Sequence, residues 1–215
     1  MISIVLLLAL QELLTPGEVV LAALALDPTP ALLKEAAEIY RYPTSDAERQ
    51  ALFEAVGRAT KDKRIDVRVA ALRALSAMGD PKAGALLEPH LREKNPSPEE
   101  KQVLLTAVDA AGRLKLSSLV PSLLQLAKGS KDPTVADQAL LALGRFHDTN
   151  ARERRSLVEK VLQLAHTLAR DRRRWRRLRP PALRCLQLLT GQKLNSVELF
   201  AAWWKVAKDS KTPFG

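Results

Sequence analysis

Apolar residues recur at helical spacing along most of the chain, and two stretches repeat the same arrangement. Residues 67–75 are Val-Arg-Val-Ala-Ala-Leu-Arg-Ala-Leu, and residues 135–143 are Val-Ala-Asp-Gln-Ala-Leu-Leu-Ala-Leu. Val, Ala, Leu, Ala and Leu occupy matching positions, and an aspartate follows each copy, at Asp80 and Asp148. A short helical repeat cannot bury its apolar face alone, so repeats stack and share a core. The pattern therefore predicts an all-α solenoid.

Proline, glycine, serine and aspartate separate the apolar stretches, and no stretch has the period of a strand. Capping residues followed by proline or acids mark helix starts, for example at residues 97–100. These signals predict five pairs of helices, each made of neighbours in the sequence. The expected pairs are 30–40 with 46–61, 65–78 with 86–91, 98–114 with 119–126, 133–143 with 150–164, and 182–186 with 196–208.

An arginine-rich stretch, 170–179, separates the last two pairs. Pro180 and Pro181 are expected to end it and to start the last pair, since proline disrupts a helix interior. The stretch would then be an insertion between helices. Four residues are expected to be equivalent in successive repeats: Leu75, Ala111, Leu143 and Leu186. Their spacings are 36, 32 and 43 residues, and the longest interval contains the insertion.

Composition agrees with helix-on-helix packing. The chain has 215 residues, of which 47% are apolar and only 4% aromatic. Leu, Ala and Val must therefore form the core, whereas a β-sandwich would need more β-branched and aromatic residues. We expect one repeat domain over residues 26–215, preceded by an apolar N-terminal segment, 1–25.

The stretch 66–75, followed by Gly-Asp-Pro at 79–81, resembles the HEAT repeat in its short bacterial form. The resemblance covers residues 28–208. It implies an α-solenoid of about five HEAT-like helical pairs, whose second helices form a continuous inner face that binds partners. The end of the chain, with residues 188–192 and the Trp203-Trp204 pair, is similar to the ends of HEAT-type proteins exported by planctomycete-like bacteria.

The same resemblance implies a structural role for two charged residues. In HEAT proteins, an aspartate and an arginine of each repeat commonly form a ladder between repeats, which would involve Asp66 and Arg68 here. The second strong copy has Thr134 and Ala136 at these positions, so the ladder is expected to be interrupted.

The chain begins with an apolar run, Ile2–Leu10. A membrane span needs about twenty residues, so no transmembrane span is expected. The length fits the hydrophobic region of a secretory signal peptide with cleavage near Ala9 or at residues 23–25, which predicts a secreted or cell-envelope protein. No lysine or arginine precedes the run, however. The alternative is a capping helix over the first repeat of a cytoplasmic protein.

No catalytic motif is apparent. The glycines stand singly, as helix ends and turns place them, so the chain contains no phosphate loop or nucleotide fingerprint. Cys185 is the only cysteine, and the three histidines are far apart in the sequence, so no metal site is expected. Glu35 and Glu38 lie one helical turn apart, but such carboxylates are usually solvated. We therefore expect a non-catalytic protein without a cofactor.

Positive charge is concentrated in one place. The formal net charge is +10, and seven arginines against Asp171 supply +6 of it within 170–179. Guanidinium groups bind carboxylates and phosphates in a planar, bidentate way, and an indole among them can stack on a base or bind a cation. The candidate partner-binding or anion-binding residues are Arg170, Arg172, Arg173, Arg174, Trp175, Arg176, Arg177 and Arg179.

These residues favour a protein-interaction scaffold that binds an acidic partner, either another protein or an acidic surface. One alternative is a cytoplasmic HEAT-like protein that binds nucleic acid through the same arginines and Trp175. Another is that Trp175 packs under the solenoid and the arginines are only solvated.

Two adjacent tryptophans, Trp203 and Trp204, lie in the last predicted helix. They project about 100° apart, so at least one is expected to be buried. We expect them to close the last repeat together with Phe200 and Val206.

Overall fold

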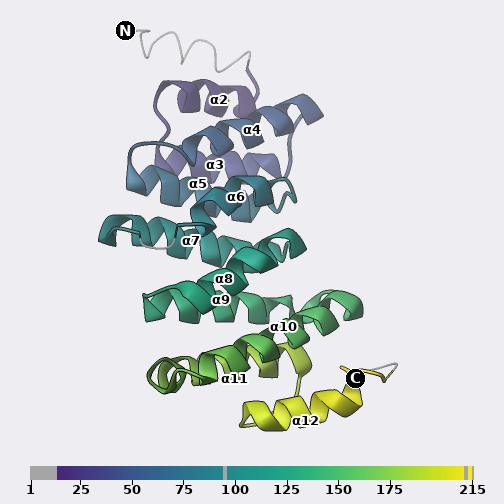
Figure 1. Cartoon of the computed structure of the whole chain (residues 1–215). Coiled ribbons are helices and arrows are strands. Elements are labelled where there is room, and N and C mark those ends of the chain that lie inside the picture. Colours follow the sequence, from purple (N-terminus) through teal and green to yellow (C-terminus); the bar gives the residue numbers. More distant parts are fainter. Residues whose placement is uncertain (1–13, 94–95, 211–212, 215) are drawn as a thin grey trace.

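The computed structural model describes residues 14–93, 96–210 and 213–214, and these residues fold as helices joined by short loops. Two 3-10 helices, η1 (Ser117–Leu119) and η2 (Arg145–Asp148), accompany eleven α-helices in this part of the chain. The α-helices are α2 (Pro16–Leu26), α3 (Pro30–Tyr40), α4 (Asp46–Ala59), α5 (Ile65–Met78), α6 (Ala83–Leu91), α7 (Pro98–Leu114), α8 (Val120–Gly129), α9 (Pro133–Gly144), α10 (Ala151–Ala169), α11 (Arg172–Thr190) and α12 (Val197–Ala207). The all-α prediction is confirmed, and the helices form a solenoid-like stack (Figure 1).

The helices lie in two layers. Helices α3, α5, α7, α9 and α11 contact one another in this order and form the first layer (Figure 1). In the second layer, α2 contacts α4, α6 follows with Leu86 beside Gly57 of α4, and α8, α10 and α12 continue the row. Both layers therefore run along the stack, and consecutive helices contact each other more extensively in the first layer than in the second.

The closest pairs also differ from the expected ones. The second-layer helices from α2 to α10 pack most closely on the first-layer helix that follows each of them, so that α2 pairs with α3, α8 with α9 and α10 with α11. Loop length explains this pairing for α8 with α9 and for α10 with α11. Only residues 170–171 join α10 to α11, and only 130–132 join α8 to α9, whereas η1 and η2 separate α7 from α8 and α9 from α10. Helices joined by two or three residues must fold back directly on each other.

The core consists of small and medium aliphatic side chains. All four residues predicted to be equivalent, Leu75, Ala111, Leu143 and Leu186, are fully buried. Consecutive repeats share this core, because one cluster of buried residues runs from α5 through α12 and a second joins α2 to α6. The predicted register of the repeats is therefore confirmed at these positions.

Consecutive first-layer helices approach closely where small residues meet. A Cβ atom added to Gly112 of α7 would lie 2.9 Å from the Cα of Ala142 in α9. At Gly144, at the end of α9, an added Cβ would lie 3.4 Å from the Cα of Cys185 in α11. A side chain at Gly112 has no room, since it would meet backbone rather than a flexible side chain. The glycine allows the two helices to pack at this distance.

The arginine-rich stretch is not an insertion. Arg172–Arg179 forms the first two turns of α11, which continues through Pro180 and Pro181 to Thr190. Asp171 caps the helix, because its Oδ1 accepts hydrogen bonds from the backbone amides of Arg173 and Arg174 at 3.0 and 3.1 Å. Each proline lacks the amide that would bond the carbonyl four residues earlier. Pro180 is exposed, so the loss falls on the solvent side of the helix.

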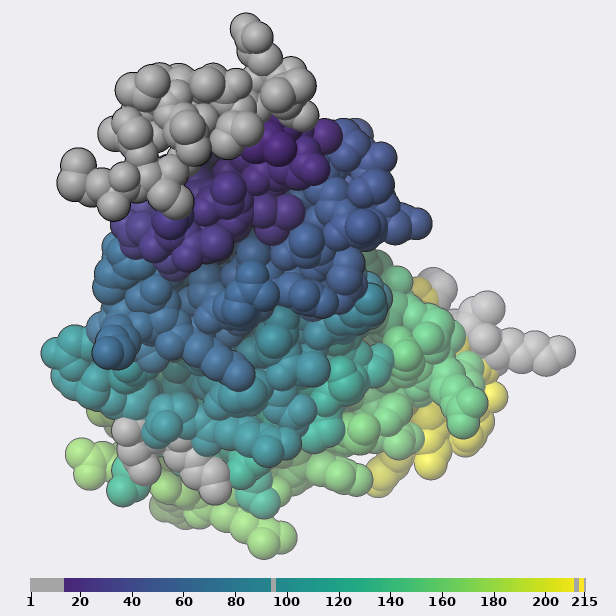
Figure 2. All heavy atoms as spheres, turned by 90° about the horizontal axis from the view of Figure 1, so that it is seen from above, coloured from purple at the N-terminus to yellow at the C-terminus, as the bar shows by residue number. Residues whose placement is uncertain are grey.

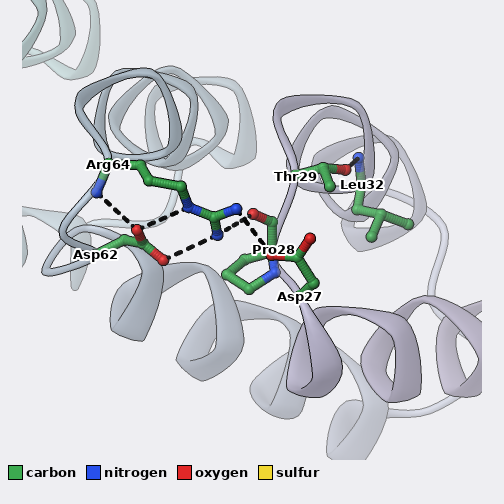
Figure 3. A network of polar contacts seen from close by, with 6 residues as sticks. All are labelled: Asp27, Pro28, Thr29, Leu32, Asp62 and Arg64. Atoms are coloured by element: carbon green, nitrogen blue, oxygen red, sulfur yellow. Dashed lines mark hydrogen bonds and ion pairs between the residues drawn. The ribbon is translucent and has the colours of Figure 1, made fainter. Parts of the chain in front are cut away.

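Polar bridges connect successive repeats along the N-terminal ends of the first-layer helices. Arg64 binds Asp62 in its own loop and reaches the α2–α3 loop, at 2.8 Å from Asp27 Oδ1 and 2.9 Å from the carbonyl of Pro28 (Figure 3). Its guanidinium lowers the pKa of Asp62 through hydrogen bonds to the carboxylate. The next links join α5 to α7 and α7 to α9: Arg68 Nη2 to Glu100 Oε1 at 2.6 Å, and Lys101 Nζ to Asp132 Oδ2 at 2.5 Å.

This row only partly matches the expected ladder. Arg68 takes part in this row, but it pairs with Glu100 and not with Asp66. The Lys101–Asp132 pair continues the row where an interruption was expected. A second row involves the repeated aspartates. Tyr40 donates a hydrogen bond to Asp80 Oδ2 at 2.6 Å, and Lys115 binds Asp148. Each of the two equivalent aspartates thus binds a side chain from the preceding repeat.

Helix α2 is part of the stack. It packs on α3 and α4, with Val20 and Leu24 buried, and lies at the N-terminal end of the described residues (Figure 2). Cleavage at residues 23–25 would remove this helix and uncover α3 and α4. The run Ile2–Leu10, read as a signal peptide or a cap, lies outside the described residues.

A buried carboxylate, Glu48 of α4, holds the start of α2. It accepts hydrogen bonds from Thr15 Oγ1 at 2.8 Å, and from the amide and hydroxyl of Thr44 at 2.5 and 2.9 Å. Burial acts to raise the pKa of Glu48, but these hydrogen bonds and one from the amide of Gly17 outweigh it and lower the pKa. Gly17 lies so close to the carboxylate that a side chain there would overlap it. Glu48 is therefore charged at neutral pH.

The close contact of α7 with α9 makes a testable prediction. Gly112→Ala should destabilise the protein by about 1–3 kcal/mol, because the added methyl group meets the backbone of Ala142. Gly129→Ala is the matched control, since Gly129 ends α8 with open space around it. Urea unfolding measures both free energies. Equal stability of the two variants would show that α7 and α9 do not approach this closely.

The Glu48 site makes a second prediction. Glu48→Gln should lower the free energy of unfolding at pH 7 by about 1–3 kcal/mol, because an amide cannot accept all the buried hydrogen bonds. The exposed Glu35→Gln should change it by less than about 0.5 kcal/mol.

The effect of Glu48 should depend on pH. A carboxylate with a lowered pKa in the folded state stabilises the protein above its unfolded pKa, about 4.3, and loses this contribution as the pH falls through the folded value. The difference between wild type and Glu48→Gln should therefore shrink below about pH 4. A difference that does not change between pH 7 and pH 3 would contradict the assignment.

Candidate anion-binding surface

The first two turns of α11 present a basic face to solvent. Five arginines, here called the arginine face, are exposed: Arg172, Arg173, Arg176, Arg177 and Arg179. At 100° per residue they lie on one side of the helix, opposite the buried Leu178, Ala182 and Cys185. They extend over only about 10 Å of helix length, since each residue rises about 1.5 Å. Charge density on this side of the helix is consequently high.

Arg174 has a different role from the arginine face. It is half-buried, and its Nη2 donates hydrogen bonds to the backbone carbonyls of Ala127 and Ser130, at 3.1 and 3.2 Å. These carbonyls lie at the C-terminal end of α8, where helices have acceptors without intrahelical partners. Arg174 therefore ties α11 to α8 and its position is fixed.

Trp175 and Arg170, the other two candidate residues, lie outside the arginine face. Trp175 is half-buried and packs against the core, as in the alternative in which it lies under the solenoid. Arg170 is exposed and caps the end of α10, just before the loop to α11. The structure thus brings all eight candidate residues to one end of α11 but divides them between solvent and core.

Two residues of the arginine face, Arg172 and Arg173, lie in the first turn of α11, where a helix is least suited to carry positive charge. Backbone dipoles leave a partial positive charge at a helix N-terminus, so cations are unfavourable there. Like charges three or four residues apart also repel, by about 0.2–0.5 kcal/mol per pair. Among the described residues, none of the five arginines makes an ion pair within 4 Å. Local stability therefore does not explain this cluster.

A cleft of about 310 Å³ opens between α11 and the α8–α9 loop. Its charged lining comes from both sides: Lys131 from the loop, and Asp171, Arg173, Arg174 and Arg177 from the start of α11. Lys131 was not among the residues predicted from the sequence. It is 40 or more positions from the arginines, and the only local signal was the turn before Asp132-Pro133.

Other groups offer little chemistry. Cys185 is fully buried, and burial raises the pKa of its thiol, so it is not an available nucleophile. Glu35 and Glu38 are exposed on α3, and Glu38 lies 3.8 Å from Lys34. In the described part of the chain, no group of three or more His, Cys, Asp or Glu residues is placed to hold a metal ion.

The tryptophan pair partly fulfils its prediction. Trp204 and Phe200 are buried, and Phe214 stacks on Trp204 with ring centroids 5.9 Å apart. The guanidinium of Arg154 in α10 lies over the ring of Phe214, with its Cζ 3.8 Å from the ring centroid. Val206 was expected to join this packing, but 82% of it is exposed, because it lies on the outer side of α12.

No family model matches the chain, and no curated protein is significantly similar to it. Within the described ranges, no helix is both long and apolar enough to cross a membrane.

Proposed function

We propose that this chain is a non-catalytic, HEAT-like interaction scaffold that binds an acidic protein partner through the arginine face of α11. The observation that carries the proposal is the cluster of five exposed arginines in the first two turns of a helix, none of them in an ion pair within 4 Å among the described residues. Glu198 of α12 interacts with Arg179 only at longer range. The rigid stack presents this face, and the acidic partner neutralises it.

The position of the charge supports binding over a role in folding. A side chain that lowers local stability without a compensating contact is typical of a functional site. An acidic surface docked here would gain bidentate contacts with guanidinium groups and would also be favoured by the dipole of α11. Complementary charge of this kind chiefly speeds association and selects the partner.

The half-buried Trp175 favours a protein over nucleic acid as the partner. Sequence-independent binding of single strands uses exposed aromatic rings on which bases stack. Within the described residues, Tyr42 is the one aromatic residue among the large exposed apolar side chains, and it follows α3, at the other end of the stack. Nucleic acid would then bind only through its phosphates. Export to the cell envelope belongs to the same proposal and depends on Ile2–Leu10 as a signal peptide.

The proposal predicts the effect of removing the charge. A variant with Arg172, Arg173, Arg176 and Arg177 each changed to Gln should keep its helical circular-dichroism spectrum, because Gln and Arg have similar helix propensity. It should recover acidic proteins from cells that naturally make this protein at least about tenfold less efficiently than wild type, corresponding to about 1.4 kcal/mol. Quantitative mass spectrometry after crosslinking measures the recovery.

A second variant controls for net charge. Changing the exposed Lys61, Lys63, Lys193 and Lys205 to Gln removes the same charge at positions outside the arginine face and should leave recovery near the wild-type level. Nuclease treatment should not change the proteins recovered with wild type. The proposal fails if both variants recover the same proteins as wild type, or if nuclease abolishes the difference and nucleic acid is what the arginines hold.

A further inference from the structure

The cleft beside α11 divides the arginines into two groups. Arg173, Arg174 and Arg177 line it, together with Lys131 of the α8–α9 loop, whereas Arg172, Arg176 and Arg179 do not. The helical geometry explains this division, because residues 173, 174 and 177 lie within about 100° of one another on the side of α11 that faces the loop. The cleft is therefore formed by two segments, the α8–α9 loop and the start of α11, and only some of the arginines of α11 line it.

The walls of this cleft are held in place by hydrogen bonds. Arg174 is fixed by the carbonyls of Ala127 and Ser130. The buried Ser130 is fixed in turn, since its hydroxyl bonds the backbone of Asp132 at 3.2 Å. On the other side, Asp171 is held by the first amides of α11. The backbone on both sides of the cleft and the side chain of Arg174 are therefore ordered before a ligand binds, and only the exposed side chains of Arg173, Arg177 and Lys131 lose freedom on binding.

Charge and size define the ligand. Four cationic side chains line the cleft against the single carboxylate of Asp171, and that carboxylate is occupied in capping α11. Such an excess suits a doubly charged group better than a carboxylate with one charge and two oxygens. A volume of about 310 Å³ is at the lower end for ligand sites, which admits a small anionic group and its attachment.

We propose that this cleft binds the phosphate group of a phosphorylated segment of the partner. The inference rests on the proposed function and narrows it, since it specifies which group of the acidic partner enters the cleft. Arg173 and Arg177 approach the phosphate oxygens from α11, and Lys131 approaches from the loop. The outer arginines, Arg172 and Arg176, then contribute only to the general field around the site.

Two probes test the proposal by isothermal titration at constant ionic strength: a short phosphoserine peptide and the same peptide with glutamate in place of phosphoserine. The phosphoserine peptide should bind wild type saturably with one site, and at least about tenfold more tightly than the glutamate peptide. Inorganic phosphate should compete with it. Equal affinity for the two peptides would overturn the assignment to phosphate.

Two double variants locate the site. Arg173→Gln with Arg177→Gln should weaken phosphopeptide binding at least about tenfold, whereas Arg172→Gln with Arg176→Gln should change it less than about threefold. Both remove two charges, four residues apart, from the same exposed helix turns. Lys131→Gln provides a third measurement on a separate loop and should also weaken binding. Equal losses in the two double variants would refute a defined cleft.

The two proposals can fail separately. If inorganic phosphate alone binds and the phosphopeptide does not, the cleft is a site for free phosphate and the inference about the partner is wrong. If no phosphate probe binds but the arginine face is still needed to recover acidic proteins, the scaffold proposal stands without the phosphate site. If phosphate binds and recovery does not need the arginine face, the scaffold proposal fails.

Discussion

The close approach of consecutive first-layer helices is the constraint on which the rest of the structure depends. Gly112 leaves no room for a side chain between α7 and α9, and Gly144 packs beside Cys185 where α9 meets α11. This spacing lets the aliphatic residues of neighbouring repeats form a shared core, and it sets α11 against α9. The start of α11 then lies beside the α8–α9 loop, so both the arginine face and the cleft follow from the packing of the layer.

The charged residues at the start of α11 differ from those at the starts of the other first-layer helices. Elsewhere in the stack, charged residues at the ends of the first-layer helices join successive repeats, as Arg68 and Lys101 do. At α11, Arg174 alone takes such a role, by binding carbonyls of the α8 end. The five arginines of the face lie on the solvent side of the first two turns of α11, where their mutual repulsion acts against stability and the helix dipole adds to it at Arg172 and Arg173. These observations support the proposal that the five arginines serve recognition.

Much of the fold was predictable because it depends on local patterns. The repeat register at Leu75 and Leu143 follows from periodic apolar residues, which report burial directly. The continuity of α11 was missed, since Pro180 and Pro181 indicate a break, whereas in the structure the helix continues through both. The pairing of helices, the site of Glu48 and the position of Lys131 were not predictable, because each depends on contacts between residues far apart in the sequence. The arginines were recognised by their density, but their division between cleft, solvent and core required the fold.

We propose that the arginine face serves binding and lowers the thermal stability of the folded chain. The most direct measurement compares the melting temperature of wild type with that of the variant in which Arg172, Arg173, Arg176 and Arg177 are replaced by Gln, at low ionic strength. We predict that the variant melts at the same or a higher temperature, since repulsion is relieved, and that added salt narrows the difference. A variant that melts several degrees lower, where about 2–4 °C corresponds to 1 kcal/mol for a chain of this size, would show that these arginines stabilise the fold and would contradict the account.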